Sequence, residues 1–181
     1  ARKNAQTAEA QSREPMQAAE RVVGDLAAEA KTLTELLAVG ESDLFPPLID
    51  AVTVEHGYET ALGAALGDDL AVPADDAAPV HWGTLPPFDT PPALPEGVTP
   101  LSYFVQAPAA LARRLSQIGI VVSEEDGKRL HASLKPGQRL VTQEGALWRW
   151  DGYTAAADAP TASAKRLEQR NRLADLEEEL V

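Results

Sequence analysis

Histidine and carboxylate side chains are the groups in this sequence that could hold a metal ion or transfer a proton. The histidines, His56, His81 and His131, lie far apart, without the close spacing that paired metal ligands show. The grouped acids fall at expected helix ends or in loops, where solvated carboxylates are common. They are Asp68, Asp69, Asp75, Asp76, Glu124, Glu125 and Asp126. The pattern predicts no metal site and no acid–base catalysis.

Nucleophiles and phosphate-binding loops are the next chemical possibility. The chain has no cysteine, which excludes disulfides, thiolate catalysis and cysteine-ligated zinc. Ser102, Ser123 and Ser133 lie outside any G-x-S-x-G turn. No glycine-rich run precedes a Lys followed by Ser or Thr, as a phosphate-binding loop requires. We therefore predict that this chain is not an enzyme and binds no cofactor.

Basic side chains are the remaining candidates. The net charge of -12 argues against a surface that binds nucleic acid all over. Residues 41–104 hold no Lys or Arg against eleven Asp and Glu, so a basic patch must come mostly from the last third and the first helix. The residues that could contact DNA phosphates are Arg113, Arg114, Lys165, Arg166 and Arg170. Solvated positions of a coiled coil explain the last three about as well as phosphate contacts do.

Aromatic residues concentrate in one stretch, LWRWDGY, at residues 147–153. A ligand cage, a buried strand and a protein interface would each explain this cluster. In a strand, Trp148 and Trp150 share one face, which weakens the case for a cage. We favour a position in the protein's own core for both indoles, with Arg149 and Tyr153 nearer the surface. The Asp-Gly pair is expected to form a turn.

The elements that must position these side chains begin with a helix at each end of the sequence. Near the start, apolar residues recur at alternating steps of three and four: Met16, Ala19, Val23, Leu26, Ala30, Leu33 and Leu37. Such a narrow apolar seam is typical of a coiled coil, and Gly40 suits the end of the helix. A lone amphipathic helix packed on its own domain is the alternative.

The final segment repeats this pattern with Leu173, Leu176 and Leu180. Its basic residues come early and its acidic residues late, the reverse of what a helix dipole favours at a true terminus, and the sequence does not begin with Met. We therefore expect an excised fragment. Its two end helices would be antiparallel partners that continue in a longer protein.

The region between the helices predicts an α+β domain. Residues 47–54 could be a strand or a short buried turn, residues 58–67 a helix, and residues 69–73 a brief strand. Residues 108–118 and 123–134 are predicted helices, the second with Ser123 as N-cap and Asp126 three positions on. Strands are expected at 119–122, within 136–142 after an opening turn, and at 146–150, the last two forming a hairpin.

Proline-rich residues 85–100 are expected to form an extended connector, because proline fixes φ and donates no hydrogen bond. We therefore divide the chain into an incoming helix (1–39), a domain (40–158) and an outgoing helix (159–181). The domain would comprise a first subdomain (40–84), the connector (85–100) and a second subdomain (101–158). No run approaches the length of a membrane span, about 18 apolar residues, and no signal peptide is recognisable.

The order of these parts resembles the hinge of bacterial SMC (structural maintenance of chromosomes) proteins. The first similar stretch is LIDAVTVEHGYETALGAALGDDL, at residues 48–70. Its positions that fit the family order are Ile49, Tyr58, Glu59, Ala64, Leu66, Gly67 and Leu70. The second is residues 121–153, where a strand, a helix and a Val-Thr strand lead to a glycine turn. The resemblance covers nearly the whole chain, including both end helices.

This resemblance implies a homodimerisation module at the end of a long antiparallel coiled coil, in a cytoplasmic, nucleoid-associated protein. ATP and Mg²⁺ would bind only at head domains outside this sequence. Family members often carry glycine pairs at the dimer contact, whereas this chain keeps Gly145 and Gly152 beside a tryptophan hairpin. The residues expected at the dimer interface are Gly145, Trp148, Arg149, Gly152 and Tyr153. The resemblance also implies DNA contact near the coil junction.

Three hypotheses follow from the sequence. The leading one is a homodimerising SMC hinge with coiled-coil stubs. The second is a DNA-binding module in which dimerisation mainly presents the basic coil junction. The third is a small-molecule domain with the tryptophans in a pocket.

Overall fold

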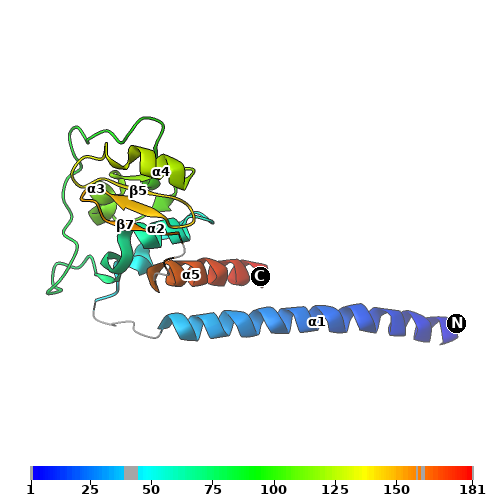
Figure 1. Ribbon diagram of the computed structural model, residues 1–181. Helices are drawn as coiled ribbons and strands as arrows, with labels where there is room; N and C mark the ends of the chain where they lie inside the picture. The colour runs from blue at the N-terminus through cyan, green and yellow to red at the C-terminus, as the bar shows by residue number, and fades with distance from the viewer. Residues whose placement is uncertain (1, 39–44, 158, 160–161, 181) are drawn as a thin grey trace. The chain divides into compact units, whose positions relative to one another are not determined.

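The computed structural model describes residues 2–38, 45–157, 159 and 162–180 (Figure 1). The chain divides into two compact units. One contains Ala1–Val39 together with Arg172–Val181, and the other is Gly40–Asn171. The boundary near the C-terminus differs from the expected one, because the globular unit extends to Asn171. The first part of the final helix is thus a component of the globule.

The first unit pairs two helices, α1 (Arg2–Ala38) and the end of α5 (Ala162–Glu179). The helices run antiparallel, as Figure 1 shows, and Arg172 contacts Glu29 across the pair. Leu176 is completely buried, and the seam of α1 is buried or half-buried at Leu26, Ala30, Leu33 and Leu37. Earlier seam positions of α1, such as Met16 and Val23, are exposed. The predicted antiparallel pair of end helices is confirmed.

The globular unit combines short helices with seven short strands among the described residues. Its 3₁₀ turns are η1 (Leu48–Ala51), η2 (Gly67–Ala71), η3 (Leu101–Tyr103) and η4 (Ala109–Leu111). Its other helices are α2 (Glu59–Leu66), α3 (Ala112–Leu115) and α4 (Glu124–His131). Its strands are β1 (Thr53–Val54), β2 (Thr99–Pro100), β3 (Val105–Gln106), β4 (Ile118–Ile120), β5 (Arg139–Val141), β6 (Leu147–Arg149) and β7 (Thr154–Ala155). The α+β class is confirmed.

The strands form two sheets. A five-stranded sheet has the order β2-β4-β5-β6-β7, and β1 pairs with β3 in a separate two-stranded sheet. Among the strands that the structure describes, only β4 and β5 are parallel, and α4 makes the crossover between them. The predicted hairpin is formed by β5 and β6, with Leu140 opposite Trp148. The predicted cap of α4 is also confirmed, since Ser123 Oγ accepts a hydrogen bond from the Asp126 amide.

Strand β6 separates two hydrophobic clusters, because neighbouring side chains of a strand point to opposite faces. Leu147 belongs to a large cluster that includes α2, η1 and Leu167 of α5. Trp148 belongs to a smaller one with Val121, Leu140 and Ala146. Trp148 is only 4% exposed, whereas Trp150, beyond the end of the strand, is 48% exposed. The preference for a core position is thus right for Trp148 and wrong for Trp150.

Two local predictions were wrong. Residues 69–73 do not form a strand, because η2 continues the turn of α2 to Ala71. The proline-rich connector ends in a regular element, since β2 pairs with β4 at the edge of the sheet. An edge strand tolerates proline because one side of it needs no hydrogen-bond donors. The middle of the connector is held by the Gln138 amide, which donates to Ala93 O at 3.0 Å.

Candidate functional site

One candidate site is a groove of about 650 Å³ beside β7, the end strand of the larger sheet. Strand β7 has a neighbour on one side only among the described residues. Polar groups and glycines of both halves of the globule line the groove: Gly67, Asp68, Asp69, Arg139, Gly145, Arg149 and Tyr153. A free strand edge presents backbone donors and acceptors that another chain can pair with. The groove therefore combines the edge of a sheet with charges of both signs.

Two turns with left-handed glycines shape this edge. Gly145 closes the β5–β6 turn with φ of 94°, and a Cβ there would lie 2.9 Å from Thr60 Cγ2 of α2. Gly152, with φ of 92°, makes the turn between β6 and β7. Arg149 N donates to Tyr153 O at 2.8 Å across that turn. The glycines therefore allow β7 to fold back along β6 and bring the first turn close to α2.

Two arginines face the groove from adjacent strands. Arg139 and Arg149 are directly opposite in the β5–β6 register, an arrangement that is unfavourable for like charges. Arg139 donates to Ala65 O at the end of α2. Burial, followed by the positive charges of Arg114 and Arg149, lowers the pKa of Arg139 to about 10. It is therefore still protonated at neutral pH.

Arg149 is held by its own turn. Its Nη2 donates to Asp151 Oδ2 at 2.5 Å, and its guanidinium lies 5.1 Å from the ring centroid of Tyr153. Desolvation raises the pKa of Asp151, but the hydrogen bonds from Arg149 and from the Tyr153 amide together outweigh it and lower this pKa below its usual range. Arg149 and Tyr153 thus form a partly exposed pair at the rim of the groove.

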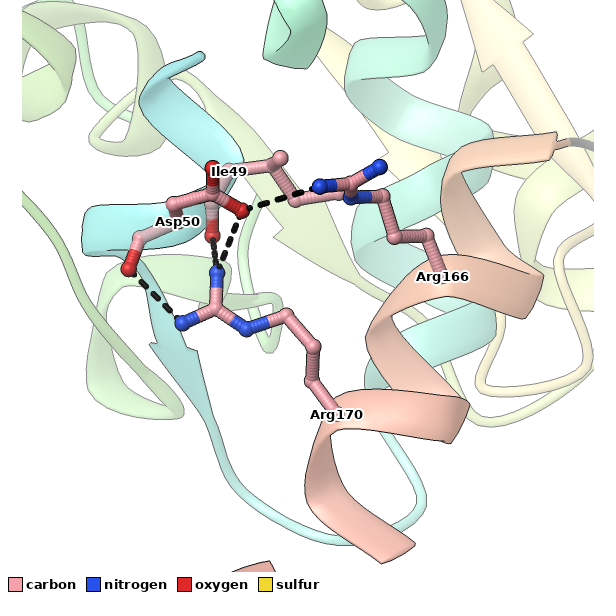
Figure 2. A network of polar contacts seen from close by, with 4 residues as sticks. All are labelled: Ile49, Asp50, Arg166 and Arg170. Carbon is pink, nitrogen blue, oxygen red and sulfur yellow. Dashed lines mark hydrogen bonds and ion pairs between the residues drawn. The ribbon is translucent and has the colours of Figure 1, made fainter. Parts of the chain in front are cut away.

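A second candidate site is the attachment of α5 to the globule. Arg166 and Arg170, one helical turn apart, both extend from α5 toward Asp50 in η1 (Figure 2). Asp50 Oδ1 accepts from Arg170 Nη1 at 3.0 Å and from Arg166 Nη2 at 3.4 Å. Arg170 also donates to the carbonyls of Ile49 and Asp50, at 2.5 and 2.7 Å. We call Asp50, Arg166 and Arg170 the Asp50 cluster.

The rest of proximal α5, residues 162–171, packs on the same part of the globule. Asn171 Nδ2 donates to Val54 O of β1 at 3.1 Å, and Ser163 Oγ donates to Gly67 O at 2.8 Å. A Cβ on Gly63 of α2 would lie 2.5 Å from Ala164 N, so the two helices touch through a glycine. These contacts join segments about one hundred residues apart in the sequence.

Comparison with known proteins identifies the family. The chain is 52% identical over 169 residues to the "Chromosome partition protein Smc" of Rhodopseudomonas palustris, covering 93% of this chain and 15% of that protein. It is 52% identical over 135 residues to the protein of the same name from Cereibacter sphaeroides, covering 74% of this chain and 12% of that protein.

Its fold matches a crystallised asymmetric dimer of the Geobacillus stearothermophilus SMC hinge domain, with a TM-score of 0.61 and 18% identity over 90% of this chain and 83% of that one. The chain belongs to the bacterial Smc family and has the fold of an SMC hinge domain. No family model matches the hinge. It spans only 12–15% of the length of these two relatives.

The residues expected at the dimer interface are in three different situations. Gly145, Arg149 and Tyr153 line the groove beside β7. Gly152 is exposed in the adjoining turn. Trp148 is buried against Gly127 within the hinge's own core, so its indole offers almost no surface to a partner. With Trp148 buried, the two tryptophans do not form the walls of a cage.

The residues expected at a DNA contact belong to two separate elements. Arg113 of α3 donates to Pro86 O and lies 4.6 Å from the centroid of Phe88, and Arg114 borders the same pocket of about 290 Å³. On α5, Lys165 is exposed, whereas Arg166 and Arg170 contact Asp50. The acidic side chain thus offsets part of the positive charge at the start of the outgoing helix.

Sequence reasoning missed the partners of α5 in the first half of the hinge. Asp50 carried a usable signal, because it is the lone charged residue in the apolar run 47–54. Within the described part of the hinge, no three His, Asp or Glu side chains are grouped to hold a metal ion. No described helix is long and apolar enough to cross a membrane.

Proposed function

We propose that this hinge forms a homodimer that joins two long coiled-coil arms of a chromosome partition protein. The free edge of β7, beside the groove lined by Gly145, Arg149 and Tyr153, is the observation that carries the proposal. The Geobacillus stearothermophilus hinge, which has the same fold, crystallised as a dimer. ATP hydrolysis would belong to other parts of the longer protein.

The charges of the groove suit contact between two copies. Arg139 and Arg149 come from the second half of the hinge, whereas Asp68 and Asp69 come from the first half, which holds no Lys or Arg at residues 41–104. In a contact with two-fold symmetry, a pair of residues that touch across the interface occurs twice, with the two copies exchanged. A surface with both signs can therefore be complementary to itself.

The hydrogen-bond pattern of β7 identifies the backbone group to test. Arg149 N donates to Tyr153 O, so residues 149 and 153 are a hydrogen-bonded pair. Such pairs alternate with non-bonded pairs in an antiparallel ladder, so Thr154, opposite Trp148, directs its N–H away from β6. Thr154→Pro would remove this outward donor and keep the hydrogen bonds between β6 and β7.

Light scattering coupled to size exclusion tests the dimer. We expect the wild-type chain to have twice the 19.3 kDa of one copy, and Thr154→Pro to shift the population toward monomer. The matched control, Thr154→Ala, keeps the N–H and should remain dimeric. A wild-type mass of one copy at every concentration would contradict the proposal. A fully dimeric Thr154→Pro variant would show that the contact lies elsewhere.

The second candidate function is DNA contact at the start of the outgoing helix. Exposed Lys165, close in sequence to the Asp50 cluster, favours this site. Neutralising DNA phosphates releases counterions, so affinity should fall steeply as salt rises. In a plot of the logarithm of affinity against the logarithm of salt concentration, Lys165→Glu should reduce the steepness of the slope by about one or more, as expected for a lost phosphate contact. The double variant Lys165→Glu with Arg166→Glu should abolish binding. Affinity for single- and double-stranded DNA that does not depend on salt or on these residues would contradict this function.

A further inference from the structure

We propose that Asp50 is a positioning residue that couples the outgoing helix to the small sheet of β1 and β3. A displacement of proximal α5 would then be transmitted to this sheet, in the first half of the hinge. The inference takes from the proposed function only that α5 leads into an arm. It does not require that the hinge dimerises.

The contacts of proximal α5 point to one partner. Asp50 and Ile49 of η1, Val54 of β1 and Gly67 after α2 all receive hydrogen bonds from this helix. Leu167, 1% exposed, packs in the cluster that contains Ile49, Val52 and Val54. The outgoing helix is therefore bound mainly by residues 48–67, although the chain reaches it directly from β7.

The Asp50 cluster has the geometry of a specific attachment. One carboxylate oxygen serves two guanidinium groups, and Arg170 uses two nitrogens on three acceptors (Figure 2). The three side chains are about one quarter to one third exposed, so the charges are only partly screened by water. Hydrogen bonds between ionised groups are stronger and more directional than neutral ones. Asp50 therefore fixes both the position and the rotation of this part of α5.

A direct path links this attachment to the small sheet. Residue Asp50 lies in η1, and Val52 joins η1 to β1, whose Thr53 and Val54 pair with Gln106 and Val105 of β3. Asn171 contacts β1 itself through Val54 O, and also Glu59 of α2. The same Glu59 accepts from Gly57 N at 2.7 Å in the β1–α2 turn. A movement of α5 would therefore act on the segments that precede and follow β1 in the chain, which are η1 and the turn into α2.

Amide hydrogen exchange resolved along the chain tests the coupling. For Asp50→Asn we expect amide exchange to become about tenfold faster both in residues 162–171 and in residues 48–54. This is the change that loss of one charge-assisted hydrogen bond implies. Exchange in β5 and β6 should stay unchanged. Asp50→Glu, which retains the carboxylate, should restore much of the protection. The control Asp89→Asn makes the same charge change at an exposed residue of the connector and should have no effect.

A second measurement reports the position of the helix. Because the chain has no cysteine, spin labels can be placed cleanly at exposed Ser102 and Lys165, which both lie in the globular unit. Dilution with unlabelled chain keeps the measured distance within one copy, whether or not the hinge dimerises. Asp50→Asn and Arg170→Lys, which loses the guanidinium fork, should each broaden the distance distribution relative to wild type and Asp89→Asn.

Three results would overturn the proposal. The first is unchanged exchange in proximal α5 of Asp50→Asn, and the second is faster exchange in α5 without faster exchange in residues 48–54. The third is an equal rise along the whole chain for both Asp50→Asn and Arg170→Lys, since that would mean general destabilisation. None of these outcomes depends on the mass of the hinge in solution, so the proposed dimer and the proposed coupling can fail separately.

Discussion

At the scale of single residues, the two neighbouring tryptophans have opposite environments. Trp148 is 4% exposed and Trp150 is 48% exposed. Replacing a buried aromatic side chain with alanine removes apolar burial and leaves a cavity, which costs roughly 3–5 kcal/mol. We therefore expect Trp148→Ala to lower the free energy of unfolding by that amount, and Trp150→Ala by less than about 1 kcal/mol. Urea denaturation followed by circular dichroism measures both, and equal losses would contradict the assigned burial.

Gly63 is the residue that lets α2 and α5 touch. A Cβ there would lie 2.5 Å from the Ala164 amide nitrogen, which is backbone and cannot rotate away. We expect Gly63→Ala to destabilise the globular unit by about 1–3 kcal/mol, as overpacking commonly does. Gly83→Ala is the matched control, because its Cβ would meet nothing within 4 Å. A Gly63→Ala variant as stable as Gly83→Ala in the same denaturation experiment would mean that the helices are further apart.

At the scale of elements, the pairing of α1 with the end of α5 should weaken at low pH. The hydrogen bond from Arg172 lowers the pKa of Glu29 below its usual range. A carboxyl group whose pKa is lower in the folded state stabilises it at pH values above its unfolded pKa, about 4.3 for glutamate. That contribution is lost as the pH falls through the lower, folded pKa. The helical circular dichroism signal should therefore fall as the pH drops from the unfolded pKa of glutamate to the lower pKa of Glu29 in the folded state.

Glu29→Gln should remove this acid-dependent step from a circular dichroism titration. The control is Glu35→Gln, whose partner Lys31 is 3.9 Å away and highly exposed, so the step should remain. Persistence of the whole step in Glu29→Gln would assign it to other carboxylates.

The elements that could be predicted from the sequence are those with local signals. Ser123 with Asp126 marked the start of α4, and the glycine turn at residues 143–145 marked the β5–β6 hairpin. Residues 69–73 lack a comparable local signal, and residues 69–71 continue the turn of α2 as part of η2 instead of forming the expected strand. The attachment of α5 depends on Asp50 and Arg170, 120 residues apart, and no local pattern connects them.

The candidate site was predicted in part for the same reason. Glycines at turns are recognisable beside short strands, and the resemblance directed attention to Gly145 and Gly152. The burial of Trp148 depends on its fit against Gly127 of α4, a contact between elements that the sequence does not specify.

At the scale of the whole molecule, the globular unit should need proximal α5 but not the rest of the end helices. A chain of residues 45–171 retains Leu167 and the hydrogen bonds that join Asp50 to Arg166 and Arg170, whereas residues 45–158 lack them. We expect the longer chain to unfold cooperatively on heating. The shorter chain should lose at least about 2–3 kcal/mol for Leu167 alone, and should melt broadly or not at all. Equal melting temperatures in calorimetry would show that α5 is dispensable to the globule.

The attachment of α5 to residues 48–67 also sets an order on protein synthesis. The ribosome releases residues 48–67 about one hundred residues before it releases proximal α5, because the hydrogen bonds between these two segments span 96 to 121 positions. At bacterial elongation rates of roughly 5–20 residues per second, the first half of the hinge waits on the order of 5–20 seconds for the helix that completes its core. During that interval the apolar surface of η1 and α2 is uncovered, and a nascent chain can be protected there by a chaperone or diverted by a neighbouring nascent hinge.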